Sequence, residues 1–142
     1  MKEIGLLNRE ISDVITRLGH GDEICICDAG FAIPDGVRDI DISLKDNHPG
    51  LIEVLAEILK YFSVEKLIIA KETKNISLSM FEKILEQFNK EIEIEVIPHV
   101  KLKERTKRVK AIIRTGEFTA YTNIILVSGT NNKRWFLEKD VQ

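Results

Sequence analysis

Apolar residues near the start of the chain follow one helix face and are succeeded by a short, continuous apolar run. Their i, i+3, i+4, i+7 spacing predicts a helix, with Asn8 as its N-cap and Gly19 as its left-handed C-cap. Residues 24–27 are apolar without interruption, which is typical of a strand buried on both faces. The apolar residues of the helix are Ile11, Val14, Ile15 and Leu18.

The two patterns alternate along the rest of the chain. A helix is expected over residues 51–62 with Pro49 in its first turn, and another is expected to be capped by Ser77 or Ser79. The second of these helices carries Phe81, Ile84, Leu85 and Phe88. Further strands are expected at residues 39–44, 67–70, 91–96 and 124–127.

Residues 101–115 fit a helix that ends at Gly116, and a strand over 111–114 is the alternative. The alternation of strands and helices predicts the α/β class, as a three-layer α/β/α arrangement around a mostly parallel sheet. The length of 142 residues fits one domain, 1–142, with a short C-terminal extension over 130–142. The apolar residues of the extension are Trp135, Phe136 and Leu137.

Composition narrows the function classes. The formal net charge of −2 argues against a nucleic-acid partner, because such proteins are usually basic. No apolar run approaches the about 18 residues of a membrane span, and no signal-peptide pattern begins the chain. Cys25 and Cys27 are interpreted as buried thiols in a reducing compartment. We therefore expect a cytoplasmic protein without a membrane partner.

Polar side chains gather where the expected strands end. Asp28, Glu72 and His99 come at or just after strand ends, and Tyr121 and Asn123 lie in the loop that enters a further strand. In parallel α/β sheets, ligands bind beyond the carboxyl ends of the strands. Hydroxyl and amide groups in the 121–123 segment suit sugar hydroxyls. The alternative for each residue is a loop side chain that binds its own backbone.

His20 stands between two glycines after the first helix. Small neighbours leave its imidazole accessible, and an ordinary pKa of about 6.5 suits proton transfer near neutral pH. The alternative interpretation is that Gly19-His20-Gly21 only ends the helix. The basic run 101–110 is interpreted as a solvated helix face, with an anion-binding patch as the alternative.

Several common sites are absent from the sequence: it has no Gly-x-Gly-x-x-Gly, no phosphate-binding P-loop, no nucleophile elbow and no clustered metal ligands. The remaining histidines and carboxylates favour acid–base chemistry without a cofactor or metal.

Five short motifs occur in order over residues 6–128. They are Leu7-Asn8 with Ile11-Ser12; Leu18-Gly19-His20; Asp28-Ala29-Gly30 with Ile33-Pro34; Ile97-Pro98-His99; and Arg114-Thr115-Gly116-Glu117 with Tyr121-Thr122-Asn123. Together they resemble the D-ribose pyranase and fucose mutarotase family, whose members interconvert ring forms or anomers of free sugars without a cofactor.

The resemblance implies a role for each candidate residue. His20 would be the catalytic acid/base, and a monosaccharide would be the substrate. The substrate-binding residues would be Asp28, His99, Tyr121, Thr122 and Asn123. The resemblance also implies a ring-shaped homo-oligomer, typically a decamer, in the cytoplasm.

The motifs of this chain are similar to those of two branches of the family. Asp28-Ala29-Gly30 with Ile33-Pro34, and His99, are similar to the ribose branch, which exchanges pyranose and furanose rings. The segment 19–24 is closer to the fucose branch, which exchanges anomers. A sugar-binding module without turnover, attached to an uptake system, is the third hypothesis.

The spacing of His20 and Asp28 complicates a single catalytic unit. If residues 24–27 form a strand, at about 3.3 Å per residue the two side chains lie roughly 20 Å apart. Either the loop 19–22 curls back, or His20 completes the site of a neighbouring subunit, which is the hypothesis we favour.

Overall fold

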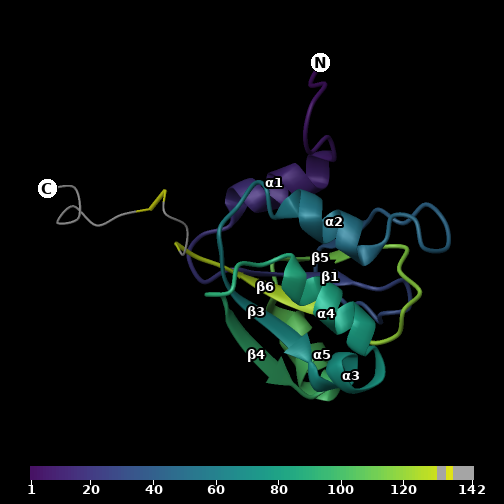
Figure 1. The fold of residues 1–142 in the computed structure, drawn as a ribbon. Helices are drawn as coiled ribbons and strands as arrows, with labels where there is room; N and C mark the ends of the chain where they lie inside the picture. Colours follow the sequence, from purple (N-terminus) through teal and green to yellow (C-terminus); the bar gives the residue numbers. More distant parts are fainter. Residues whose placement is uncertain (131–133, 136–142) are drawn as a thin grey trace, which may run out of the picture.

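The protein is built around one sheet, seen in a computed structural model that describes residues 1–130 and 134–135. The sheet within these residues has the strand order β2-β5-β1-β6-β3-β4 (Figure 1). Its strands are β1 (Glu23–Cys27), β2 (Asp39–Asp41), β3 (Val64–Ala70), β4 (Glu93–Ile97), β5 (Ala111–Arg114) and β6 (Ile124–Ser128). The pairs β1–β5, β2–β5 and β3–β4 are parallel, whereas β6 is antiparallel to both of its neighbours, β1 and β3.

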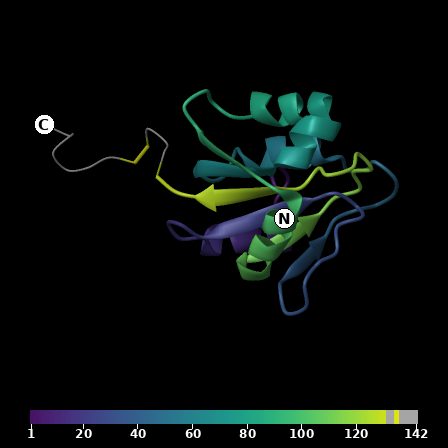
Figure 2. The ribbon, with the colours of Figure 1, turned by 90° about the horizontal axis from the view of Figure 1, so that it is seen from below.

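Helices cover both faces of the sheet, which confirms the α/β class with three layers (Figures 1 and 2). One core cluster packs α1, α2 and α4 against the sheet, and the other packs α5 and the segment after β1 against the opposite face. The helices are α1 (Arg9–Arg17), α2 (Leu51–Ile58), α3 (Lys71–Ile76), α4 (Leu78–Glu86) and α5 (His99–Arg105), the last followed by a 3₁₀ turn (Thr106–Arg108).

The first helix forms as its pattern predicts, but its end differs. Asn8 caps α1, since its side chain accepts a hydrogen bond from the Ile11 N–H at 2.9 Å. The C-cap is Leu18 in an extended conformation, so the expected left-handed cap at Gly19 is wrong. Gly21 instead takes the positive φ, +87°, at the turn into β1. The chain therefore reverses two residues later than predicted.

The helix expected over 101–115 forms only as far as residue 105, so its extension to 115 is wrong, and the alternative strand over 111–114 is confirmed. The helix ends at Arg105, and Ala111–Arg114 forms β5 between β1 and β2. Ala111 and Ile113 enter one core while Ile112 enters the other. The helical pattern failed because a strand covered on both faces is apolar at successive positions, which also fits part of a helix face.

Other helices and strands form where they were predicted but begin or end at different residues. The helix expected over 51–62 ends at Ile58, and β2 ends at Asp41 rather than at residue 44. β3 begins at Val64, before the expected residue 67. The short polar helix α3 had no apolar periodicity to reveal it. Phe136 and Leu137 of the C-terminal extension lie outside the described residues, and no helix within the described part is long and apolar enough to cross a membrane.

Gly116 follows β5 and was expected to cap a helix; it instead packs against the backbone of residues 45–48. Its N–H donates to the Pro49 carbonyl at 2.9 Å, and its carbonyl accepts from the Asn47 N–H at 2.7 Å. An added Cβ would lie 2.6 Å from the Lys45 carbonyl oxygen and 2.7 Å from the His48 carbonyl oxygen. Only glycine fits this approach without moving the backbone.

We predict that Gly116→Ala lowers the free energy of unfolding by about 1–3 kcal/mol, because overpacking against backbone forces a rearrangement. Gly19→Ala is the matched control, since its Cβ would meet only Asp22 Oδ2 at 3.5 Å, an ordinary contact. Urea unfolding of both variants checks this. Equal stability of the two variants would show that the 45–48 turn yields without cost.

Candidate active site

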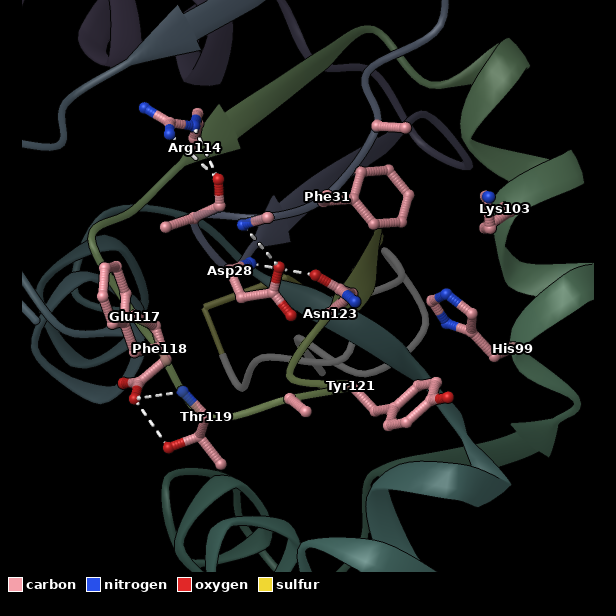
Figure 3. Close-up of a pocket in the computed structure, with 14 residues that line it drawn as sticks. Asp28, Phe31, His99, Lys103, Arg114, Glu117, Phe118, Thr119, Tyr121 and Asn123 are labelled. Carbon is pink, nitrogen blue, oxygen red and sulfur yellow. Dashed lines mark hydrogen bonds between the residues drawn. The ribbon is translucent and has the colours of Figure 1, made fainter. Parts of the chain in front are cut away.

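A cavity of about 700 Å³ opens at the edge of the sheet where the parallel strands end (Figure 3). Asp28 follows β1, Arg114 ends β5, and His99 begins α5 just after β4. Asn123 directly precedes β6. Because β6 runs antiparallel, its beginning lies at the same edge as the ends of its neighbours. Asp28, His99, Tyr121 and Asn123 therefore meet here, whereas Glu72 does not line the cavity.

Asp28 and the loop before β6 are held together by hydrogen bonds. The Asp28 N–H donates to Asn123 Oδ1 at 2.9 Å, and Asp28 Oδ2 accepts from the Thr122 N–H at 3.3 Å. Asp28 Oδ1 accepts from the Gly30 N–H at 3.1 Å. We call these contacts the Asp28 clasp. They fix the carboxylate while the amide nitrogen of Asn123 faces the cavity (Figure 3).

Asp28 as a whole is 9% exposed. Burial raises its pKa above the ordinary value, although the hydrogen bonds from Thr122 and Gly30 and the nearby His99 act in the opposite direction. The loss of hydration on burial raises the pKa by more than these contacts lower it. A buried carboxylate with a free lone pair toward a cavity is suited to accept a hydrogen bond from a ligand hydroxyl.

Aromatic rings frame one side of the cavity. The His99 ring stands edge-on between Phe31, with centroids 6.2 Å apart, and Tyr121, at 5.1 Å (Figure 3). Burial lowers the pKa of His99 below its ordinary value, while the charge of Glu72 acts to raise it. A lowered pKa favours the neutral imidazole, in which one nitrogen donates and the other accepts.

The Tyr121–Asn123 loop has a strained backbone that its neighbours support. Tyr121 has a positive φ of 58°, and its carbonyl accepts a hydrogen bond from the Thr73 hydroxyl. Thr122 is fully buried, and its hydroxyl donates to the Thr119 carbonyl at 2.7 Å. Among the described residues that line the cavity, Tyr121 and Asn123 are present and Thr122 is not. Thr122 contributes through its main chain.

Other lining residues were not predicted to belong to the site. Arg114 donates from Nη2 to the Ala29 carbonyl at 2.9 Å and from Nη1 to Asp41 Oδ2 at 2.9 Å, which holds the loop after β1. Glu117 accepts from the Leu51 N–H at 3.0 Å, so it caps α2. These contacts are long-range, and only the Arg114–Glu117 motif pointed to them in the sequence.

His20 lies at the opposite edge of the sheet. Its Nε2 is 2.9 Å from Glu65 Oε2, and its side chain is 62% exposed. The Gly21 N–H donates to the Ser128 carbonyl at the end of β6, at 2.7 Å. The five residues of β1 lie between His20 and Asp28, and at about 3.3 Å per residue the strand alone is roughly 17 Å long, which no monosaccharide spans. The loop 19–22 does not curl back, so one chain contains two separate parts of the predicted site.

The cavity can bind a small polyhydroxylated molecule. Carboxylate, amide, imidazole and phenol groups line it from three segments, and aromatic rings supply apolar contact (Figure 3). In the described part of the chain, no group of three or more histidine, cysteine, aspartate or glutamate side chains is arranged to hold a metal ion.

The raised pKa of Asp28 predicts a pH dependence of stability. The folded state binds the Asp28 proton more tightly than the unfolded state does, so this group's contribution to unfolding free energy falls as pH rises above about 4. Asp28→Asn cannot titrate. We expect the stability of the wild type relative to Asp28→Asn to decrease from pH 4 upward in urea unfolding. An increase with pH would contradict the buried, destabilised carboxylate.

Comparison with known proteins identifies the family. The model of the RbsD / FucU transport protein family matches residues 1–131. A D-ribose pyranase of Pseudothermotoga lettingae is 43% identical over 129 residues, which cover 91% of this chain and 92% of the relative.

Solved structures agree with this similarity. The structure of Bacillus subtilis RbsD complexed with D-ribose matches with a TM-score of 0.88 at 42% identity, covering 93% of this chain and 100% of that chain. A fucose mutarotase from Streptococcus pneumoniae, solved with L-fucose, matches with a TM-score of 0.67 at 22% identity and shares the fold, covering 89% of this chain and 95% of that chain. This chain therefore belongs to the RbsD/FucU family.

Proposed function

We propose that this protein is a D-ribose pyranase, which interconverts the β-pyranose and β-furanose forms of D-ribose. Its similarity to the ribose-bound Bacillus subtilis protein along almost the whole chain carries the proposal. The D-ribose pyranases are similar to this chain at 40–45% identity, whereas the fucose mutarotase shares only the fold. L-Fucose mutarotation is therefore the second candidate.

The reaction requires two proton transfers. Opening the pyranose removes the proton of the anomeric hydroxyl and delivers one to the ring oxygen as its bond to the anomeric carbon breaks. Rotation of the open aldehyde then lets the C4 hydroxyl add to the same carbon, with the proton transfers reversed. A positioned histidine contributes about 10²–10⁴-fold to such chemistry, and the proposed mechanism needs no cofactor.

We assign the sugar to the cavity beside the Asp28 clasp. Asp28 would accept a hydrogen bond from a sugar hydroxyl, the Asn123 amide would donate one, and His99 and Tyr121 would bind further hydroxyls. Thr122 would act through its main-chain bond to Asp28. The lining of the cavity by these polar groups supports the assignment.

His20 would be the catalytic acid/base, acting in the cavity of a neighbouring subunit. Its separation from Asp28 by the length of β1 supports a shared site, and its exposure leaves it available to a partner chain. The contact with Glu65 would orient the imidazole. The Cβ of any larger residue at Gly129 would fall within 2.2 Å of Glu65 Oε2, so Gly129 leaves room for that carboxylate.

A shared site requires an oligomer. We propose a closed ring of subunits, a decamer as the family resemblance implies, because identical head-to-tail contacts must close to complete every site. We further propose a cytoplasmic location. Cys25 and Cys27 are both free and buried, which is consistent with a reducing compartment.

Saturation-transfer NMR on D-ribose tests the activity. We expect the wild type to exchange magnetisation between pyranose and furanose signals, and His20→Ala to lose about 10²–10⁴-fold of the rate, as expected for removal of an acid/base. His48→Ala is the matched control, since His48 is an exposed histidine outside the cavity. The same measurement with L-fucose compares the two sugars.

Each result decides between the hypotheses. Faster exchange for fucose than for ribose would favour the mutarotase. Ribose binding without any exchange would leave the non-catalytic sugar-binding module. Equal rates for His20→Ala and the wild type would remove His20 from the mechanism.

Mixed oligomers test the shared site. His20→Ala and Asp28→Ala chains should each be inactive alone. In an equal mixture, about a quarter of the sites would combine an intact His20 with an intact Asp28 from another chain. We therefore expect about a quarter of the wild-type exchange rate to return after co-refolding. Failure to recover activity in oligomers shown by native mass spectrometry to be mixed would contradict a site between subunits.

A further inference from the structure

Glu72 links two helices beside the cavity. It lies in the first turn of α3, directly after β3, while His99 begins α5 after the neighbouring strand β4. The parallel pairing of Ala70 with Ile97 brings these two turns together. Glu72 Oε2 accepts a hydrogen bond from the His99 N–H at 2.9 Å. One oxygen of the carboxylate therefore satisfies the first turn of α5.

The other polar atoms at this junction are left without partners. Among the described residues, three buried side-chain atoms have no hydrogen bond of good geometry: Glu72 Oε1, His99 Nδ1 and Glu95 Oε2, the last of which still lies 2.8 Å from Lys66 Nζ. Two of the three thus belong to residues already joined by a hydrogen bond. A buried polar atom without a partner destabilises the folded protein. A carboxylate oxygen accepts, and Nδ1 donates when it carries the proton, so the two atoms complement each other.

We propose that Glu72 is a positioning residue that holds His99 in the tautomer protonated on Nδ1, leaving Nε2 as an acceptor for a hydroxyl of the bound sugar. The Nδ1–H group donates to Glu72 Oε1, directly after a small ring rotation or through one shared water. Both arrangements produce the same tautomer. The sugar part of this inference rests on the proposed function, whereas the tautomer does not.

The charges around His99 influence whether its ring is neutral, and only a neutral ring has two tautomers. Glu72 faces the ring from α3, Lys103 from α5 and Asp28 from the end of β1, with Phe31 and Tyr121 at its sides. Glu72 and Asp28 act to raise the pKa of His99, while burial and Lys103 lower it. Burial is the largest of these effects and favours the neutral ring, in which only one nitrogen carries a proton. A fixed tautomer makes His99 an acceptor, next to the donor amide of Asn123.

Histidine tautomers are measured directly by long-range ¹H–¹⁵N NMR. The chain has 3 histidines, and the signal missing from His99→Asn identifies residue 99. We expect protonated Nδ1 in the wild type. Glu72→Gln keeps an oxygen for the His99 N–H but replaces the second acceptor by an NH₂ donor. We therefore expect this variant to favour the Nε2–H tautomer and to titrate His99 at lower pH.

Glu82→Gln is the matched control, because Glu82 is exposed on α4 and its replacement removes the same charge. It should leave the His99 signals unchanged. A wild-type His99 protonated on Nε2 would overturn the inference without any variant. An unchanged tautomer in a folded Glu72→Gln protein would overturn it as well.

Ribose titration separates this inference from the proposed function. Loss of one acceptor should weaken ribose binding by Glu72→Gln about three- to tenfold, as expected for one hydrogen bond, with Glu82→Gln unaffected. If the wild type neither binds nor exchanges ribose, the proposed function fails, and the tautomer spectra still decide the role of Glu72. If ribose binds equally to all three proteins, Nε2 is not a sugar acceptor.

Discussion

The antiparallel direction of β6 is the constraint on which the candidate site depends. β6 pairs with β1 on one side and β3 on the other, in the middle of an otherwise parallel sheet. All five residues of the strand are buried and its apolar residues alternate between the two cores, so slipping it by one residue would move each apolar side chain into the other core and change the register of both ladders. Its direction brings the Tyr121–Asn123 loop to the edge where β1, β3 and β4 end. With a parallel β6, that loop would have entered from the opposite edge.

The Asp28 clasp depends on this arrangement for its structure and, under the proposed function, for sugar binding. Asn123 satisfies the Asp28 N–H, and Asp28 accepts from Thr122, so each side of the junction depends on the other. The carboxylate stays buried at a cost in hydration, which its raised pKa reflects. Arg114 and Glu117 brace the surrounding loops through bonds to Ala29 and Leu51. Under the proposed function, a pocket held by these bonds would offer polar groups to a sugar without having to be ordered by it.

The same strands that build the pocket exclude His20 from it. A strand is a rigid spacer, so residues at its two ends cannot approach the same small ligand. Under the proposed function, each chain therefore supplies a pocket at one edge and an acid/base at the other, and catalysis depends on assembly. Within the pocket, Glu72 and His99 would add a second level of organisation, because the tautomer of a neutral ring decides whether it donates or accepts.

The sequence by itself determined the α/β class, most of the elements and the polar residues at strand ends. Those features depend on local periodicity and on chemistry carried by single side chains, such as the cap at Asn8 and the continuous apolar run before Asp28. Only the tertiary structure decided that 111–114 is a strand. Its apolar residues fit a helix or a strand locally, and the strand follows from their alternate packing into the cores on the two faces of the sheet. It also decided the direction of β6, the packing of Gly116 against residues 45–48 and the separation of His20 from Asp28. Strand direction and close backbone approach arise from pairing between distant segments, which no local pattern encodes.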